Sequence, residues 1–306
     1  NKKTTDALTE VVIPSEYGVA TMPVNAGNIR NHGYEIYLNV VPVSSKDLTW
    51  ALNFNTARNF NEVTRSGNNQ LETWNSLASG TAYVEGYAAS SFFAFNYKGL
   101  DPVTGYPTFN IPELTDASKK NVSLLMQHVG QLDPKFTGGF GTNIRYKGFN
   151  LNSSFTLSLG AKKFLAPLYN NSNQSAPYPT QNLSSALNNR WRKSGDEAFT
   201  NIPSLPTANI PFPAFGNSGY PIYSLYDYST VRVVDADYLR CRNVGLSYAI
   251  PPKMLAKAHI QQLSLQASVT NLFYIASGKL DGIDPEVSGN SLPIPRTYSL
   301  TLNVGF

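Results

Sequence analysis

The side chains best suited to covalent chemistry are scattered along this sequence of 306 residues. The three histidines are His32, His128 and His259, and no serine or cysteine nucleophile motif lies near any of them. The single cysteine, Cys241, has no partner for an internal disulfide, and no Cys/His spacing typical of zinc occurs. We therefore expect no enzyme activity, no metal site and no cofactor.

Acidic residues lie close together in sequence at three places, and a glycosidase needs two carboxyls at a set separation beside a cleft. The groups are Asp196/Glu197, Asp235/Asp237 and Asp281/Asp284/Glu286. Aspartate before glycine or proline commonly initiates a turn, so Asp284-Pro285-Glu286 is interpreted as loop structure. Arg240 and Arg242 follow the second group, and we expect them to pair with Asp235 or Asp237 in a structural role.

The segment 161–230 is the most suggestive candidate for ligand binding. Its aromatic residues lie among Asn, Ser and Pro, and aromatic faces beside amides bind sugars and peptides by stacking and hydrogen bonding. The candidate ligand-binding residues are Tyr169, Tyr178, Trp191, Tyr220, Tyr223 and Tyr226. The alternatives are that these rings pack the loop itself, contact a partner, or form the interfacial girdle of a membrane barrel.

The apolar residues recur with a period of two, which indicates strands. The clearest stretches are 34–40, 48–55, 151–160, 243–250, 263–270 and 298–306. Their alternate positions hold mainly Asn, Ser, Thr, Gln and Gly, whereas a soluble sandwich usually carries Lys, Glu and Arg there. Small neutral polar residues suit a wet lumen, and the apolar face then meets lipid. We therefore predict an all-β fold, a transmembrane antiparallel β-barrel.

The overall composition agrees with this prediction. Charged residues make up 14% of the chain, below the roughly 25% of an average soluble domain, and aromatic residues make up 12%. The net charge of +4 is spread along the chain without a basic cluster, so we expect no nucleic-acid partner. No apolar run approaches the roughly 20 residues that a spanning helix requires.

The links between these strands alternate in length. Short links lie at 42–47, 147–148 and near 251–252, and long links at 62–80, 99–132, 161–230 and 273–295. Outer-membrane barrels have short periplasmic turns and long extracellular loops. Alternation requires two more strands between Gly80 and Leu132, for which Thr81–Tyr87 and Ser91–Tyr97 are candidates. The total is about ten strands, including a partial first one. An open edge in lipid is unfavourable, so we expect residues 1–306 to be the C-terminal part of a larger barrel.

The last nine residues carry an apolar or aromatic side chain at every second position. These residues are Tyr298, Leu300, Leu302, Val304 and Phe306. A terminal Phe on an alternating final strand resembles the β-signal that is read by the bacterial outer-membrane barrel assembly machinery. We expect this strand to act as such a signal.

Segments along nearly the whole chain resemble, in order, SusC-like TonB-dependent outer-membrane transporters of the RagA/SusC family. They include NKKTTDAL (1–8), NAGNIRNHGYEIYL (25–38), GLDPVTGYPTF (99–109), DPKFTGGFGTNIRYKGF (133–149), RWRKSGD (190–196), VDADYLRCRNVGLSYAIP (234–251) and GIDPE (282–286). Several members carry an aspartate-rich DxNGDG loop before the Pro-Lys motif. This sequence has Val122–Gln131 there, which leaves metal binding unsupported.

The resemblance implies an outer-membrane importer of oligosaccharides or oligopeptides. It implies a 22-stranded barrel with long extracellular loops, of which this chain supplies about the last ten strands. The implied partners are a SusD-like surface lipoprotein, TonB with ExbB and ExbD acting through a plug, the remaining N-terminal part of the same barrel, and outer-membrane lipid. The alternatives are a soluble or surface β-rich glycan-binding protein and a passive porin.

Overall fold

The computed structural model describes residues 1–12, 15–18, 21–66, 73–110, 122–169, 182–206, 221–256, 259–280, 282–287 and 291–306. The chain divides into two compact units. The first unit comprises Asn1–Asn31, Asn61–Asp133 and Lys162–Asp235, and the second comprises His32–Phe60, Pro134–Ala161 and Ala236–Phe306. Within the described ranges, no helix has the length and apolar character needed to cross a membrane.

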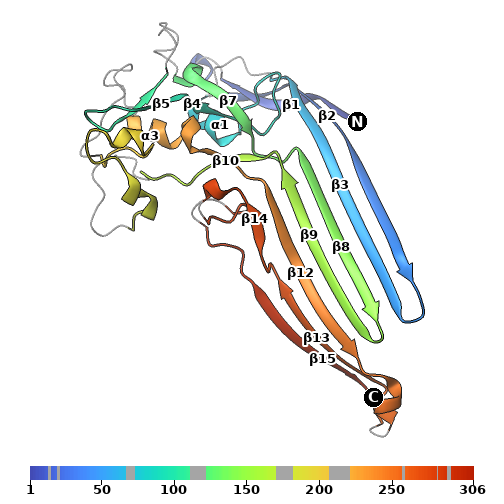
Figure 1. Cartoon of the computed structure of the whole chain (residues 1–306). Helices are drawn as coiled ribbons and strands as arrows, with labels where there is room; N and C mark the ends of the chain where they lie inside the picture. The colour runs from blue at the N-terminus through green and yellow to red at the C-terminus, as the bar shows by residue number, and fades with distance from the viewer. Residues whose placement is uncertain are drawn as a thin grey trace. The chain divides into compact units, whose positions relative to one another are not determined.

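A nine-stranded sheet of long antiparallel strands is the largest element of the fold (Figure 1). In spatial order its strands are β1 (Lys2–Val12), β2 (Thr21–Ser44), β3 (Leu48–Arg65), β8 (Phe136–Tyr146), β9 (Phe149–Leu159), β12 (Tyr238–Ala249), β13 (Gln262–Thr270) and β15 (Thr297–Gly305). The short strand β14 (Tyr274–Ala276) pairs with the start of β12. Short turns and long connections alternate between successive strands of this path, as the sequence predicts.

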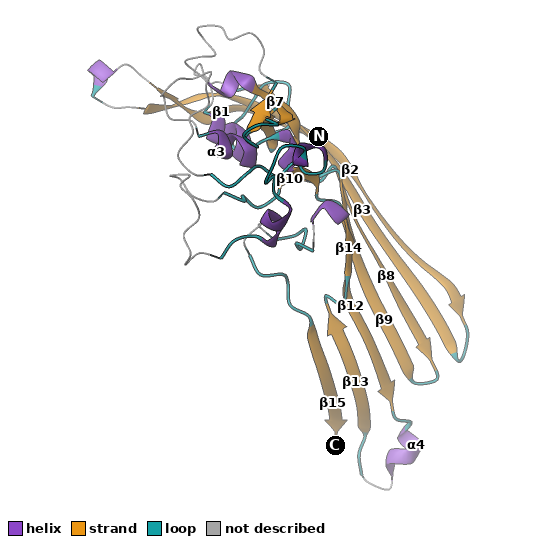
Figure 2. Cartoon of the chain, turned by 60° about the vertical axis from the view of Figure 1, so that its left-hand side comes forward, coloured by secondary structure: helices purple, strands orange, loops and turns teal. Residues whose placement is uncertain are grey.

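The connections between these strands, chiefly the long ones, carry the smaller elements (Figure 2). Three two-stranded sheets pair β4 (Ser91–Phe95) with β7 (Met126–Gln131), β5 (Tyr97–Leu100) with β6 (Pro107–Phe109), and β10 (Lys162–Phe164) with β11 (Val233–Asp235). The α-helices are α1 (Trp74–Ser79), α3 (Ile222–Asp227) and α4 (Pro252–Leu255). The 3-10 helices are η1 (Ser15–Tyr17), η2 (Val122–Leu125), η3 (Ser185–Asn189), η4 (Asp196–Ala198), η6 (Thr230–Arg232) and η8 (Gly278–Leu280).

The two strands predicted between Gly80 and Leu132 do not join the large sheet. Residues 81–87 form coil and turn. The strand β4 pairs with β7 and forms one isolated bridge to Ser229, while β3 pairs directly with β8. The reason is the burial of β4, whose five residues are all covered, whereas a barrel strand exposes every second side chain. The described sheet therefore contains eight strands along its path plus β14, and not ten.

The pairing register separates two chemically different faces of the sheet. One row of directly opposed residues is Trp50, Ile144, Leu151, Leu246, Ala267 and Leu300. The next row is Ala51, Asn143, Asn152, Gly245, Ser268 and Ser299. Neighbouring residues of a strand point to opposite faces, so one face is apolar and the other is polar. The apolar face is uncovered: Leu246 is 49% exposed and Leu300 is 74% exposed.

The two buried apolar clusters of the described residues both lie in the first unit. The larger contains Phe95, Leu125, Leu168, Tyr169, Leu187, Ile222, Tyr223, Leu225 and Tyr226. The smaller contains Leu77, Ala82 and Phe93. The connections of the first unit therefore pack on one another around a core of their own.

A charge placed on the apolar face should destabilise the sheet more than the same charge on the polar face. We expect Leu246→Arg to lower the free energy of unfolding in lipid vesicles by about 2–4 kcal/mol, because arginine would sit in hydrocarbon. Ser247→Arg, one residue away on the polar face, is the matched control and should change stability little. Urea titration of the folded protein in vesicles measures both, and equal losses would contradict the assignment of the faces.

Candidate functional site

The polar face of the sheet is built from asparagines that lie across glycines of the neighbouring strand. A Cβ at Gly141 would stand 2.7 Å from the Asn53 side-chain oxygen, and a Cβ at Gly245 would stand 2.8 Å from that of Asn152. A Cβ at either position would therefore push the asparagine side chain aside, so glycine leaves room for the amide of the neighbouring strand. Asn243 Nδ2 also donates to Asn152 Oδ1 at 2.8 Å. The result is a polar surface of uncharged amides, some of which are hydrogen-bonded to one another.

A β-bulge in β12 brings two arginines to this polar face. The pairing of β12 with β9 shifts between Cys241 and Asn243, so Arg242 is an extra residue in its strand. Arg240 lies opposite Thr156, and Arg242 Nε donates to Thr156 Oγ1 at 3.0 Å. Without the bulge, the two arginines and Asn243 would not all face the same side of the sheet.

Glu286 and Asp284 neutralise these two arginines. Glu286 forms ion pairs with both Arg240 and Arg242, and Asp284 forms an ion pair with Arg240. The side chains of Arg240 and Asp284 are each 1% exposed, so this pair is removed from water. Two positive and two negative charges cancel within the cluster, which we call the arginine–carboxylate cluster.

Neighbouring groups fix the cluster in place. Tyr238 donates its hydroxyl to Glu286 Oε1 at 2.7 Å. Asp284 accepts from the backbone N–H groups of Glu286 and Ile294, at 3.0 and 3.1 Å. The Arg240 guanidinium lies 5.0 Å from the centre of the Tyr274 ring. The cluster therefore attaches the connection between β14 and β15 to the polar face of β12.

The predicted partners of the two arginines were wrong. Asp235 forms an ion pair with Lys162 at 3.2 Å, and Asp237 accepts the Gly160 N–H at 2.6 Å. Closeness in sequence misled the prediction, because the true partners lie 44 or 46 residues from the arginines. The GIDPE segment, interpreted only as a loop, was the signal that could have identified them.

The predicted ligand-binding aromatics divide into two groups. Tyr178 and Tyr220 lie outside the described residues. Tyr169, Trp191, Tyr223 and Tyr226 are all buried in the first unit. Their rings are almost completely covered, so contact with a ligand would require this core to open.

The buried tyrosines pack chiefly on one another. The Tyr169 ring centre lies 4.8 Å from that of Tyr223 and 5.9 Å from that of Tyr226. The Tyr169 hydroxyl donates to the Pro203 carbonyl at 2.8 Å, and the Tyr223 hydroxyl lies 3.2 Å from Ser204 Oγ. Burial raises the pKa of Tyr223 to about 12. These three tyrosines thus form a neutral, hydrogen-bonded core for the loops.

Trp191 joins two of the recognised sequence segments. Its ring lies over Gly105, where a Cβ would stand 2.2 Å from the ring and where φ is +68°. Its indole N–H donates to Glu197 Oε2 at 3.0 Å. The pKa of Glu197 is lowered by a hydrogen bond from its own backbone N–H and, next, by this bond from Trp191. The 99–109 and 190–204 loops therefore pack together, with a further bond from Ser204 N–H to the Gly105 carbonyl at 3.0 Å.

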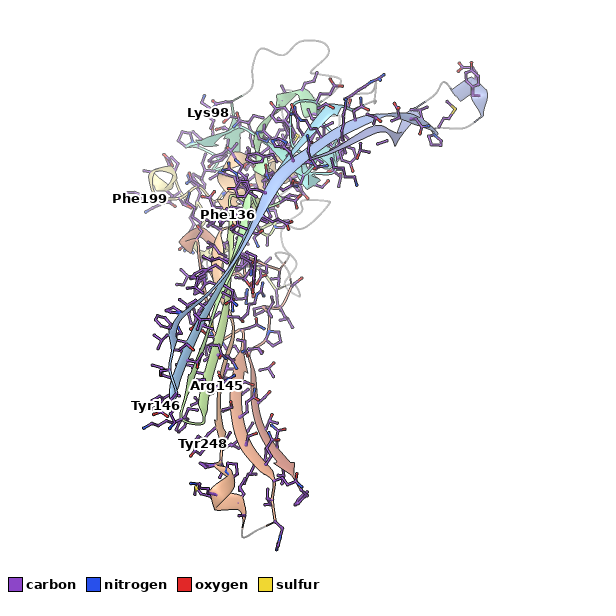
Figure 3. The ribbon with its side chains drawn as sticks, turned by 90° about the vertical axis from the view of Figure 1, so that its right-hand side faces the viewer. Lys98, Phe136, Arg145, Tyr146, Phe199 and Tyr248 are labelled. Carbon is purple, nitrogen blue, oxygen red and sulfur yellow. The ribbon has the colours of Figure 1, made fainter. Side chains whose placement is uncertain are left out.

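Two apolar side chains project from these joined loops into solvent. Phe199 follows η4 and is 92% exposed (labelled in Figure 3), and Val103 is 81% exposed. Both stand on rigid turns: Asp196 accepts from the N–H groups of Arg192 and Lys193, and Asp101 accepts from that of Val103 at 3.0 Å. A rigid, exposed aromatic side chain is typical of protein interfaces.

The residues of the expected assembly signal lie on β15 and just after it. The four from Tyr298 to Val304 oppose Val269, Ala267, Leu265 and Leu263 on β13 and share the apolar face. All are exposed, as is Phe306, which follows the end of the strand. Their recognition by the assembly machinery stays a prediction.

Removing Glu286 should destabilise the second unit, because it leaves Arg242 without its carboxylate and Arg240 with Asp284 alone. We expect Glu286→Ala to lower the free energy of unfolding by about 3–5 kcal/mol, the range for breaking a buried ion pair. The double variant Glu286→Ala/Arg242→Met should recover part of this loss, because it leaves the Arg240–Asp284 pair neutral. Glu35→Gln on β2 is the exposed control. Denaturant titration in vesicles measures all three, and purely additive losses would contradict coupling within the cluster.

A buried aspartate should make the loop core of the first unit sensitive to pH. Asp227 accepts from the backbone N–H groups of Leu168 and Tyr169 at 2.9 and 3.2 Å, and burial raises its pKa from 3.8 to about 6. The folded loop therefore binds the proton more tightly than the unfolded loop, so stability falls as pH rises from about 4 to 6 and is level above. The change is on the order of 2–3 kcal/mol.

Hydrogen exchange of the Leu168 and Tyr169 amides, corrected for the intrinsic rate at each pH, measures this effect. We expect protection to decrease between pH 4 and pH 7 in the wild type and to vary less in Asp227→Asn, which cannot ionise. Protection that increases over this range in the wild type would contradict the assignment.

Comparison with known proteins gives a consistent result along the chain. No family model matches it. TonB-dependent receptor P3 of Formosa agariphila is 26% identical over 343 residues, covering 99% of this chain and 31% of the relative. TonB-dependent receptor SusC of Bacteroides thetaiotaomicron is 28% identical over 331 residues, covering 100% of this chain and 29% of the relative. The chain therefore spans about a third of the length of these relatives.

Comparison with solved structures agrees with the sequence comparison. The structure of the RagAB peptide transporter matches 99% of this chain and 32% of its own, with a TM-score of 0.74 and 25% identity. The chain is therefore related along nearly its whole length to SusC-like TonB-dependent receptors, and its large sheet is part of an outer-membrane β-barrel of that kind.

Proposed function

We propose that this chain is the barrel portion of an outer-membrane active importer for oligosaccharides or oligopeptides. The observation that carries the proposal is the two-faced sheet, with an uncovered apolar face for lipid and a polar face of paired amides for solute. Similarity to TonB-dependent receptors and to a peptide transporter supports the same function. Residues 1–306 would supply the C-terminal part of the barrel, and the rest of the same protein its other strands and plug.

The chemistry of the polar face favours cargo without a strong net charge. Amides and hydroxyls both donate and accept hydrogen bonds, which suits sugar hydroxyls and peptide groups alike. The charges of Arg240 and Arg242 are cancelled by Asp284 and Glu286. The wall around this cluster therefore carries no net charge to select an anion, and the one arginine nearer the turn on the same face of β8 is Arg145. The cargo classes proposed are oligosaccharide and oligopeptide.

The proposal includes partners on both sides of the membrane. A SusD-like surface lipoprotein would capture cargo at the extracellular loops, and TonB with ExbB and ExbD would supply energy through the plug. The exposed side chains of Phe199 and Val103 support a protein contact at the loops. The reaction is transport without covalent chemistry.

Dependence of uptake on TonB distinguishes the proposed importer from its alternatives. We expect cells that carry the intact protein to accumulate labelled oligosaccharide or oligopeptide, and to lose this uptake when TonB is deleted. A passive porin would continue to admit the solute without TonB. A soluble glycan-binding protein would stay in the aqueous fraction, which the uncovered Leu246 and Leu300 argue against.

Phe199 should contribute to binding of the surface lipoprotein. We expect Phe199→Ser to reduce co-purification of the lipoprotein about fivefold or more, because truncation of an aromatic hot spot costs over about 1 kcal/mol. Met254→Ser, which truncates another exposed side chain in α4, is the matched control and should leave co-purification unchanged. Unchanged binding by Phe199→Ser would move the lipoprotein contact away from this loop.

A further inference from the structure

The short turns at one end of the large sheet are hydrogen-bonded to one another. The Lys147 N–H donates to the Asp47 carbonyl at 3.1 Å, and the Ala249 N–H donates to the Gly148 carbonyl at 2.9 Å. Three connections thus join in a row: residues 45–47, residues 147–148 and residues 250–255, which include α4. We call this row the turn rim. All of it lies in the second unit, and Figure 2 shows the turns and α4 at the same end of the strands.

The turn rim is positively charged. It carries the exposed lysines Lys46, Lys147 and Lys253, and its one acidic residue is Asp47. Lys147 has a φ of +48° and Gly148 a φ of +99°, as in the tight two-residue turn that joins β8 to β9. The backbone therefore fixes the position from which the Lys147 side chain extends.

An aromatic row lies directly beside the rim on the apolar face. The opposed residues of this row are Leu48, Tyr146, Phe149, Tyr248, Leu265 and Leu302. The ring centres of Phe149 and Tyr248 are 4.4 Å apart, and Lys147 Nζ lies 5.3 Å from the centre of the Tyr146 ring. Figure 3 labels Tyr146 and Tyr248 near the turns.

Together these features define where a lipid headgroup would lie. Aromatic residues mark the boundary between hydrocarbon and headgroup in membrane barrels, and short turns face the periplasm. The lysines of the rim stand just beyond that boundary, at the depth of the phosphate groups. Lysine near a membrane surface is attracted to anionic headgroups, and zwitterionic headgroups attract it much less.

We propose that the turn rim binds the headgroups of anionic glycerophospholipids in the periplasmic leaflet, through Lys46, Lys147 and Lys253. The aromatic row holds the acyl–glycerol boundary of the same lipids, so the headgroup phosphate meets the lysines. This inference rests on the membrane placement of the sheet and not on import, so a transport defect alone neither supports nor opposes it.

Native mass spectrometry of the intact protein in detergent tests the proposal. The protein is offered phosphatidylglycerol and phosphatidylcholine with identical acyl chains, so only the headgroups differ. We expect the wild type to retain phosphatidylglycerol in preference to phosphatidylcholine. Each lysine removed should reduce that preference by up to about fivefold, and the Lys46→Gln/Lys147→Gln/Lys253→Gln variant should lose it almost completely.

The matched control removes three exposed lysines from connections that are not part of the rim. Lys98→Gln/Lys193→Gln/Lys279→Gln makes the same change in net charge, and we expect it to keep the preference. The single rim variants should show graded losses, and resistance to heat in detergent gels verifies that each protein is folded.

Three results would overturn the proposal. The first is equal retention of the two lipids by the wild type, and the second is the same loss of preference in the control variant, which would indicate net charge alone. The third is preferential retention of lipid A over phosphatidylglycerol through the rim lysines, which would place the rim at the outer leaflet. Added salt should weaken phosphatidylglycerol binding more in the wild type than in the triple rim variant, and this result would support the proposal.

Discussion

The cross-strand register of the large sheet is the constraint on which the other features depend. Side chains alternate between faces, so a slip of one residue in any pair would exchange the apolar and the polar face of that strand. From Trp50 to Leu300, six strands keep their apolar residues opposed. Among these pairs of strands, the register shifts at Arg242, between β12 and β9. The extra residue supplies a positive charge, which Glu286 in the connection after β14 neutralises. Both the amide surface and the arginine–carboxylate cluster therefore follow from register.

Much of the sheet could be predicted from the sequence, because a period of two is a local property of strands such as β9, β13 and β15. The sequence could not predict that residues 81–97 stay out of the sheet, because a fully buried strand and a barrel strand are both rich in aromatic residues. Phe92 and Phe93 pack inside the first unit, and this depends on neighbours far along the chain. The alternation of link lengths also led to a wrong strand count, because the single connection 66–132 was interpreted as two loops with two barrel strands between them.

The candidate site was predicted less well, for a related reason. An aromatic residue in a polar loop has the same sequence signature whether its ring meets a ligand or another ring. Tyr169, Tyr223 and Tyr226 meet one another, and only their burial distinguishes the two cases. The arginines of β12 were identified but their partners were not, since 44 residues separate Arg240 from Asp284. The sequence predicted that small neutral polar residues line one face. It could not predict which asparagine lies across which glycine, because that depends on the pairing register between strands.

If the chain is part of an importer as proposed, the hydrogen bonding within the amide surface has a consequence for the motion of a solute along it. Where each asparagine is already paired with a neighbour, as Asn243 is with Asn152, a passing hydroxyl or peptide group exchanges one hydrogen bond for another of similar strength. Hydrogen-bonding positions on adjacent strands would then bind the solute with nearly equal free energy, so the solute would not stay at any one of them. In the proposed importer, such a wall would let polar cargo diffuse along it without a strong binding position.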